Sequence, residues 1–130
     1  MERTEQKVKT YLEERGWDNL RPVDLAKSIM IEGAELLEIF QWENRSLEEV
    51  RNSAEKIEKI KKELADVMIY CFEMATLLNL DTQKIIEDKL DHAAKKYPAD
   101  LMRKNAKAES GSGEDSEYWR IQKEYRQKGD

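Results

Sequence analysis

The sequence predicts an all-α protein, and two observations carry that prediction. Only 5 of its 130 residues are Gly and 2 are Pro, and just two glycines, Gly16 and Gly33, precede Pro98. A β-sandwich or barrel needs many more Gly, Asn and Pro residues between its strands. The second observation is a run of apolar residues that alternate three and four positions apart, as on one face of a long helix. This predicted seam consists of Ile57, Ile60, Leu64, Val67, Cys71, Met74 and Leu78.

Local signals bound the first two helices. The first is expected over residues 4–15, where Gly16 breaks it. The second is expected to begin near Pro22, because proline suits the first turn of a helix, and to extend to about residue 42. Its apolar stripe consists of Ala26, Met30, Gly33, Leu37 and Phe40.

The next three helices also carry recognisable boundaries. Ser46 with Glu49 three positions later is a capping-box pattern, which predicts the start of a short helix. The seam then predicts a long helix that ends near residue 79, and a last core helix is expected from 82 to about 97, where Pro98 stops it.

The length of the seam predicts how the helices assemble. An apolar pattern sustained for three heptads is typical of helices that pack at a shallow angle in a bundle. The seam is longer than one small protomer can cover, and small helical units often complete their core by oligomerising. We therefore expect a four-helix-bundle type protomer that forms a homodimer or a dimer of dimers, which is a homotetramer.

Composition divides the chain into a core and a tail. Residues 1–98 are expected to form one all-α core, and residues 99–130 a charged tail. The tail balances its acidic and basic residues, so the net charge of -5 resides in the core. Residues 109–116 have the Gly/Ser-rich composition of a flexible linker, and residues 117–127 suit a short helix with aromatic groups.

Composition also excludes several function classes. The sequence has no glycine-rich phosphate loop, and a net charge of -5 argues against a basic surface for nucleic acid. No apolar run approaches the ~18 residues of a membrane span, and the amino terminus lacks the apolar stretch of a secretory signal. The single cysteine, Cys71, cannot form an internal disulfide, so we expect a small core residue in a cytoplasmic protein.

Two pairs of carboxylates border the apolar stripes. Glu32 and Glu35 lie three residues apart on the second helix and share a face, with Glu38 nearby. Glu63 and Asp66 show the same spacing on the long helix, each directly before a residue of the seam. Since the two stripes should pack together, the acidic pairs should approach each other.

Carboxylates brought together at a helix interface repel one another and are costly to bury without partners. Too few lysines or arginines lie nearby along the chain to neutralise them, and oxygen-only ligands suit Mg²⁺, with Mn²⁺ as a substitute. The alternative is a non-enzymatic helical oligomerisation or regulatory module, in which the acids are solvated or salt-bridged. The distance of these acids from one another separates the two hypotheses.

These residues also carry a family resemblance. Residues 32–42 (EGAELLEIFQW) and 63–70 (ELADVMIY) resemble the two metal-binding motifs of the all-α nucleotide pyrophosphohydrolases of the MazG-like group. Lys89-Leu90 and residues 96–98 resemble the end of the family's last helix. Residues 15–17 (RGW) are similar to a segment of the small dCTP-hydrolysing members. The resemblance extends over about residues 11–98.

The resemblance implies an enzyme that cleaves nucleoside triphosphates between the α and β phosphates, giving monophosphate and pyrophosphate. Its expected role is the removal of non-standard or excess (deoxy)nucleotides. It implies that Mg²⁺ is held by Glu32, Glu35, Glu63 and Asp66, with Glu35 also counted as catalytic. Glu38 is expected as a further ligand or as the residue that orients the attacking water.

The resemblance further implies a set of substrate contacts. Lys89 is expected to contact phosphate, Tyr70 to line the sugar or phosphate pocket, and Trp17 and Trp42 to stack on the base. Lys96 and Tyr97 complete the expected substrate-binding residues. The sequence departs from the family at Ala93, where an Asn or Arg is usual, which leaves base and sugar selectivity open. A related pyrophosphohydrolase that acts on a phosphoribosyl-ATP-like substrate is a further alternative.

Overall fold

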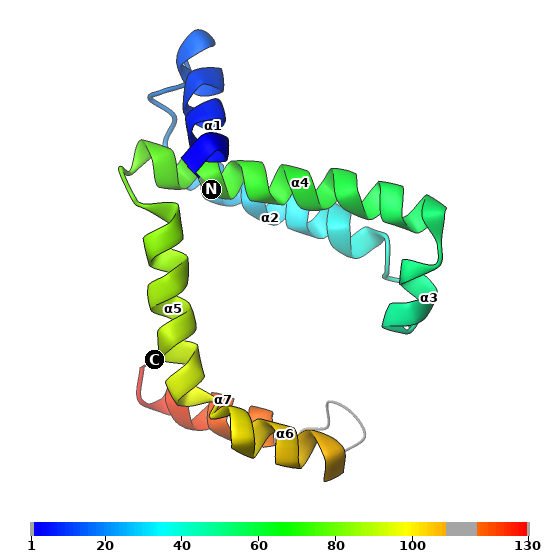
Figure 1. Cartoon of the computed structure of the whole chain (residues 1–130). Helices are drawn as coiled ribbons and strands as arrows, with labels where there is room; N and C mark the ends of the chain where they lie inside the picture. The colour runs from blue at the N-terminus through cyan, green and yellow to red at the C-terminus, as the bar shows by residue number, and fades with distance from the viewer. Residues whose placement is uncertain (1, 109–116, 130) are drawn as a thin grey trace. The chain divides into compact units, whose positions relative to one another are not determined.

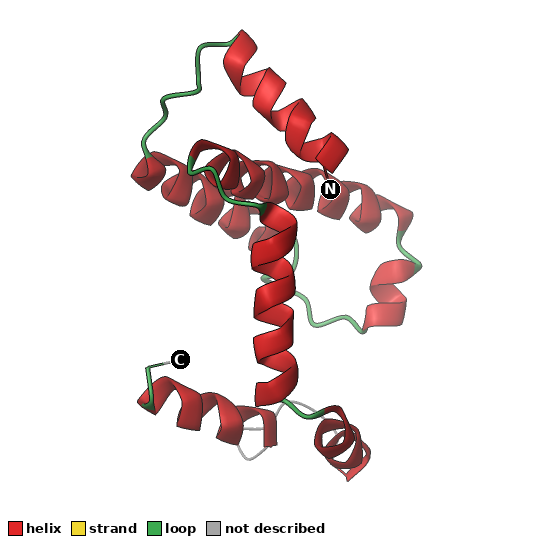
Figure 2. Ribbon diagram, turned by 60° about the vertical axis from the view of Figure 1, so that its left-hand side comes forward, coloured by secondary structure: helices red, strands yellow, loops and turns green. Residues whose placement is uncertain are grey.

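The computed structural model describes residues 2–108 and 117–129, and these residues form helices and connecting turns without a strand (Figures 1 and 2). The all-α prediction is therefore confirmed for the described part of the chain. The predicted linker, residues 109–116, lies outside it. The helices are α1 (Glu2–Glu14), α2 (Pro22–Glu38), α3 (Leu47–Arg51), α4 (Ala54–Leu77), α5 (Thr82–Lys96), α6 (Ala99–Ala108) and α7 (Glu117–Gln127).

Contacts divide the chain into two units, residues 1–82 and 83–130. The first unit holds α1 to α4, and the second holds nearly all of α5 together with α6 and α7. None of the described helices is long and apolar enough to cross a membrane.

The first unit is built on the pairing of α2 with α4. These helices lie side by side and run antiparallel, and α3 connects them at one end (Figures 1 and 2). Near the other end α1 packs on α4, where Val8, Leu12 and Phe72 form a buried cluster. Leu20 and Leu77 pack against this cluster, so the core lies at the junction of α1 with the end of α4.

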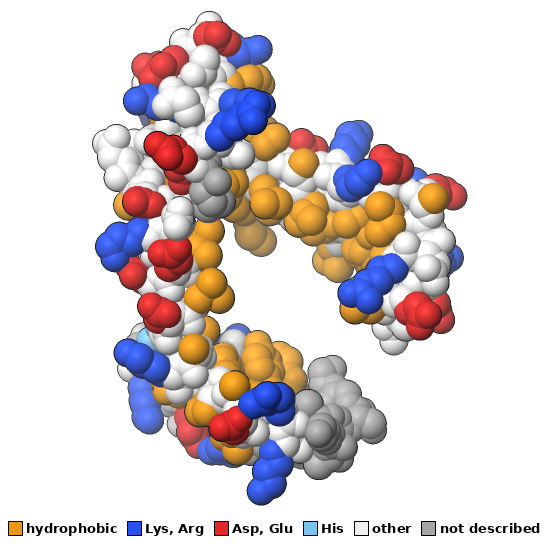
Figure 3. Space-filling view, in the orientation of Figure 1, with side chains coloured by type: hydrophobic (Ala, Val, Ile, Leu, Met, Phe, Trp, Pro, Cys, Tyr) orange, Lys and Arg blue, Asp and Glu red, His pale blue; other side chains and the backbone are white. Residues whose placement is uncertain are grey.

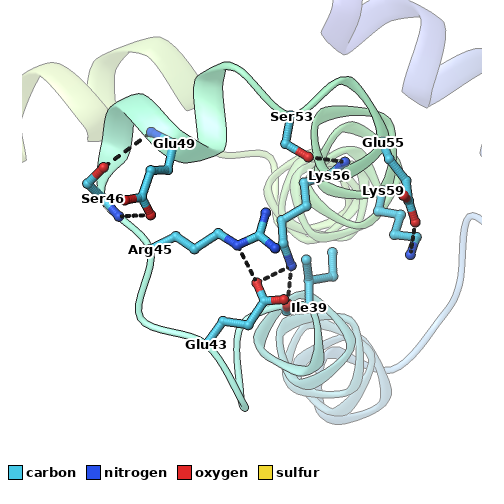
Figure 4. Close-up of polar contacts among 9 residues, drawn as sticks. All are labelled: Ile39, Glu43, Arg45, Ser46, Glu49, Ser53, Glu55, Lys56 and Lys59. Carbon is cyan, nitrogen blue, oxygen red and sulfur yellow. Dashed lines mark hydrogen bonds and ion pairs between the residues drawn. The ribbon is translucent and has the colours of Figure 1, made fainter.

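Several helix ends carry the signals expected from the sequence. Pro22 occupies the first turn of α2. The capping box before α3 is confirmed, because the Ser46 side chain accepts a hydrogen bond from the Glu49 backbone N–H and the Ser46 N–H donates to the Glu49 carboxylate (Figure 4). The Ser53 hydroxyl oxygen similarly accepts a hydrogen bond from the backbone N–H of Lys56 at the start of α4.

A polar clamp joins the end of α2 to the start of α4. The helix ends at Glu38, several residues before the expected position, and the chain continues in turns. Lys56 Nζ donates to the Ile39 carbonyl at 3.1 Å and forms an ion pair with Glu43, which also pairs with Arg45 (Figure 4). Because the last carbonyls of a helix lack partners within it, a donor from α4 stabilises this end of α2.

The predicted seam is only partly covered in the first unit, and the expectation that Cys71 is a core residue is wrong. Cys71 is exposed, as are Leu64 on α4 and Met30 and Leu37 on α2. The physical reason is that α1 covers a different side of α4, where Phe72 is buried. Ile57, Ile60, Val67 and Met74 of the seam are half-buried, and exposed apolar side chains gather along one face of α2 and α4 (Figure 3).

The second unit contains a helix that the sequence analysis did not anticipate. Pro98 ends α5 as expected, but α6 begins directly after it. The helix α7 occupies the range in which a short helix was expected. Its Tyr118 ring stacks on Tyr97 with ring centroids 5.2 Å apart, and Tyr125 meets His92 edge to face. The aromatic residues of α7 therefore pack on the end of α5.

The core of the first unit predicts a large effect of one truncation. Leu12 is 1% exposed, so Leu12→Ala should leave a cavity and lower the free energy of unfolding by about 2–5 kcal/mol. Urea denaturation followed by circular dichroism measures this change. Val23→Ala, at a side chain that is 55% exposed, is the matched control and should change stability by less than about 0.5 kcal/mol. Equal effects of the two substitutions would contradict the assigned core.

Candidate functional site

The acidic residues of α2 and α4 meet across the paired helices. Glu32 on α2 and Glu63 and Asp66 on α4 each offer a carboxylate oxygen, and these three oxygens lie within 4.8 Å of one another. All three residues are half-buried. Because residues three apart share a helix face, Glu63 and Asp66 approach Glu32 from the same side. We call these residues the acid cluster.

Glu35 adjoins the acid cluster from α2. Its residue as a whole is exposed, yet its carboxyl lies within hydrogen-bond reach of Glu32 and of Glu63. The neighbouring Glu32 carboxyl is the main reason that the pKa of Glu35 is raised. Burial, followed by the nearby Glu35, raises the pKa of Glu63. Glu38 is exposed and contributes a weaker repulsion of the Glu35 charge.

Basic side chains and hydrogen-bond donors in the described part of the chain offset little of the negative charge of the acid cluster. Glu32 Oε2 and Glu63 Oε2 are buried without a hydrogen-bond partner in the described part of the chain. Lys62 favours the charged form of Glu63, but burial and Glu35 outweigh it. Buried carboxylate oxygens normally find a donor or a cation. A set of close, unpartnered oxygen donors without His or Cys fits a hard divalent cation such as Mg²⁺.

A cavity of about 680 Å³ opens beside the acid cluster. Residues of α1, α2 and α4 and of the connection between α1 and α2 line it. Asp66 belongs both to the acid cluster and to the cavity wall, so the cavity and the carboxylates form one continuous site. Other wall residues are Tyr11, Trp17, Leu25, Tyr70 and Glu73.

Two of the expected substrate contacts line this cavity. Trp17 is 45% exposed, and its ring meets Tyr11 edge to face with centroids 5.9 Å apart. Tyr70 is half-buried, and its hydroxyl lies within hydrogen-bond reach of Ser28. Burial is the main cause that raises the pKa of Tyr70. The cavity is therefore lined by aromatic side chains as well as by Asp66 of the acid cluster.

The other expected contacts lie elsewhere. Trp42 follows the end of α2, is 88% exposed and does not line the cavity. Lys89 is exposed on α5 of the second unit. In that unit Lys96 Nζ lies 4.7 Å from the centroid of the Tyr125 ring, and the Tyr97 hydroxyl donates a hydrogen bond to Gln122. Their roles toward a substrate stay predictions.

Four ionisable residues of the cavity wall, Lys7, Tyr11, Asp24 and Glu73, were not expected from the sequence, and Glu73 is the most buried of them. The signal was present, because Asp66, Tyr70 and Glu73 are spaced four and three residues apart and so share a face of α4. An acidic residue within an apolar stretch is a second signal, since glutamate is rarely buried without a reason.

Comparisons with known proteins agree with this arrangement. A sequence model described as the MazG-like family matches residues 27–111. Human dCTP pyrophosphatase 1 is 29% identical over 96 residues, which cover 72% of this chain and 56% of that protein. The chain thus spans just over half of that relative. The crystal structure of a pyrophosphatase from Archaeoglobus fulgidus DSM 4304 is 34% identical, with a TM-score of 0.66 over 75% of this chain and 92% of that one.

The raised pKa values of Glu35 and Glu63 predict how the metal-free protein responds to pH. A carboxyl whose pKa is raised on folding binds more protons in the folded state, so stability should increase as the pH falls from neutral toward 4.5, the ordinary value for glutamate. Glu63→Gln removes part of the repulsion and should flatten this dependence. The stability of the metal-free protein can be followed as the denaturation midpoint at several pH values in the presence of a chelator.

Glu58→Gln is the control, because Glu58 is an exposed residue of the same helix that pairs with Lys61. It should keep the pH dependence of the unsubstituted protein. If Glu63→Gln showed that same dependence, the repulsion within the acid cluster would not contribute to stability.

Proposed function

The chain belongs to the MazG-like family, and on that premise we propose that it hydrolyses (deoxy)nucleoside triphosphates to monophosphate and pyrophosphate in a Mg²⁺-dependent reaction. The observation that carries the proposal is the acid cluster, whose unpartnered buried oxygens border a cavity. The names of two similar proteins, a human dCTP pyrophosphatase and an archaeal pyrophosphatase, support the same reaction class.

Glu32, Glu35, Glu63 and Asp66 are the residues that would hold the metal. Bound Mg²⁺ would supply positive charge that neutralises the triphosphate and favours loss of a proton from water. The closely spaced carboxylates of α2 and α4 would bind and orient the ion, and Glu35, which lies close to both Glu32 and Glu63, would add its carboxylate to theirs. Glu38 adds a ligand or orients the attacking water.

The cavity suits the nucleoside part of the substrate. Tyr70 lies on the cavity wall one helical turn from Asp66, close to where the sugar or phosphates would bind. Trp17 presents an aromatic face on which a base can stack. Lys89, Lys96 and Tyr97 remain proposed substrate contacts from the family resemblance, as does Trp42. Clearance of excess or non-standard nucleotides from a cytoplasmic pool is the corresponding cellular role.

The geometry favours the enzyme over a purely structural helical module. In such a module the carboxylates would be far apart in solvent or paired with lysine and arginine. Instead, three of them converge and two buried oxygens lack partners among the described residues. Surface carboxylates gain little from such an arrangement, since like charges at short range repel.

We also propose that a second copy of the chain covers the exposed apolar face of α2 and α4, giving a homodimer or a homotetramer. Met30 and Leu37 are 73% and 65% exposed, and Leu64 and Met68 of α4 are also exposed. A face of this kind on a small protein is typical of an interface. The long seam predicted from the sequence lies on α4 and supports the same assembly.

The central test is pyrophosphate release from a panel of NTPs and dNTPs, with Mg²⁺ and with chelator. Activity should require the metal. Glu35→Gln should lower kcat/KM by at least about a hundredfold, because a neutral amide binds the cation less strongly than a carboxylate. Circular dichroism should show an unchanged fold, since the amide does not repel the neighbouring carboxylates. Glu58→Gln should retain full activity. If no nucleotide of the panel, phosphoribosyl-ATP included, released pyrophosphate in the presence of Mg²⁺, the proposed reaction would be refuted.

The proposed assembly can be tested by light scattering coupled to size-exclusion chromatography. The double substitution Met30→Lys and Leu37→Lys places charges on the exposed face and should yield monomers, because burying two lysines without partners is unfavourable. Lys9→Glu on the exposed side of α1 is the control and should leave the mass unchanged. A monomeric mass for the unsubstituted protein would contradict the assembly.

A further inference from the structure

The backbone of Trp17 is anchored to the buried core of the first unit. The helix α1 ends in a Schellman motif, in which Gly16 is left-handed with a φ of 67° and the Trp17 N–H donates to the Leu12 carbonyl at 2.9 Å. The Gly16 N–H donates to the Glu13 carbonyl at 3.2 Å and completes the motif. Because Leu12 is 1% exposed, a core residue fixes the position of Trp17 on the cavity wall.

The ring of Trp17 is held in turn by Tyr11. The two rings meet edge to face, with their centroids 5.9 Å apart and an interplanar angle of 66°. Aromatic pairs prefer this arrangement, and the contact restricts the rotation of both side chains. Trp17 is still 45% exposed, so part of its surface is free to contact a ligand in the cavity.

Arg15 fixes Tyr11 from outside the cavity wall. The guanidinium carbon of Arg15 lies 3.9 Å from the centroid of the Tyr11 ring, and Arg15 Nη1 donates a hydrogen bond to the Tyr11 carbonyl at 3.1 Å. The planar guanidinium thus stacks on the tyrosine ring, and its hydrogen bond keeps it there. Tyr11 and Trp17 line the cavity, whereas Arg15 does not. We therefore expect Arg15 to affect a ligand in the cavity through these two rings.

We propose that Arg15 and Tyr11 are positioning residues that hold the Trp17 ring as a preformed stacking surface for the base of the substrate. The inference rests on the proposed function and adds to it two residues that act through a third. A side chain that is fixed before binding loses little conformational entropy when a base stacks on it. Release of the ring should therefore weaken binding of the base by roughly two- to tenfold, the cost of ordering one side chain.

A double-mutant cycle measures this role by titration calorimetry with dAMP in the presence of Mg²⁺. Arg15→Met should weaken dAMP binding by roughly two- to tenfold, but should have no effect in a protein that carries Trp17→Ala, because no ring is left to position. Tyr11→Phe retains the ring and should keep the affinity, whereas Tyr11→Leu should weaken it. Arg3→Met removes the same charge from an exposed position of α1 and is the matched control with unchanged affinity.

Three further readouts separate the ring from the metal site. Inorganic pyrophosphate has no base, so Arg15→Met should leave its binding unchanged. In turnover assays Arg15→Met should raise KM and leave kcat unchanged, because it removes binding that the ground state and the transition state share. In protein labelled with 5-fluorotryptophan, the fluorine NMR signal that Trp17→Phe removes belongs to Trp17, and Arg15→Met should shift or broaden that signal.

The outcomes distinguish this inference from the proposed reaction. If no triphosphate were hydrolysed but the cycle with dAMP gave the expected result, the reaction would be refuted and the positioning role would stand. If triphosphates were hydrolysed but Arg15→Met left dAMP binding unchanged, or weakened it equally in the Trp17→Ala protein, the positioning role would be overturned. An equal loss of pyrophosphate binding in Arg15→Met would overturn it as well.

Discussion

The repulsion among carboxylates across the α2–α4 pair is the constraint on which the rest of the structure depends. Glu32 and Glu63 face each other from different helices with buried, unpartnered oxygens. Lys56 opposes this repulsion at one end of the pair, because it ties the start of α4 to the end of α2. The apolar cluster around Leu12 and Phe72 fixes α1 on the other end of α4.

The cavity exists because α1 covers only part of the α2–α4 pair. Because α1 crosses only part of α4, a cavity remains between α1, α2 and α4, bounded by the acid cluster on one side. Its wall carries Asp66 of the acid cluster together with the aromatic rings of Tyr11 and Trp17. This combination suits a ligand with a charged part and a flat apolar part, as the proposed nucleotide substrate has.

The parts of this structure that depend on local sequence could be predicted. The capping box at Ser46 and Glu49 marks its helix because both partners lie within one turn. The seam identified α4 as a helix but not its partner, since periodicity shows that a face is apolar and not what covers it. For the same reason Cys71 was misplaced.

The spacing of the acids predicted two pairs, and the approach of Glu32 to Glu63 further depends on the register of two helices. Trp42 lies away from the cavity because the cavity wall uses the start of α2, around Leu25 and Ser28, whereas Trp42 follows the other end of that helix.

That clamp and the acid cluster respond to protons in opposite ways. The hydrogen bond from Lys56 lowers the pKa of Glu43, whereas the pKa values of Glu35 and Glu63 are raised. In the metal-free protein, acidification therefore protonates Glu35 and Glu63 first, while the Glu43 carboxylate is still ionised. Between these two titrations lies an interval of pH in which the repulsion that involves Glu35 and Glu63 is reduced and the ion pair of Lys56 with Glu43 persists. One pair of helices thus contains both an acid-stabilised and an acid-labile junction, separated along the axis of α4.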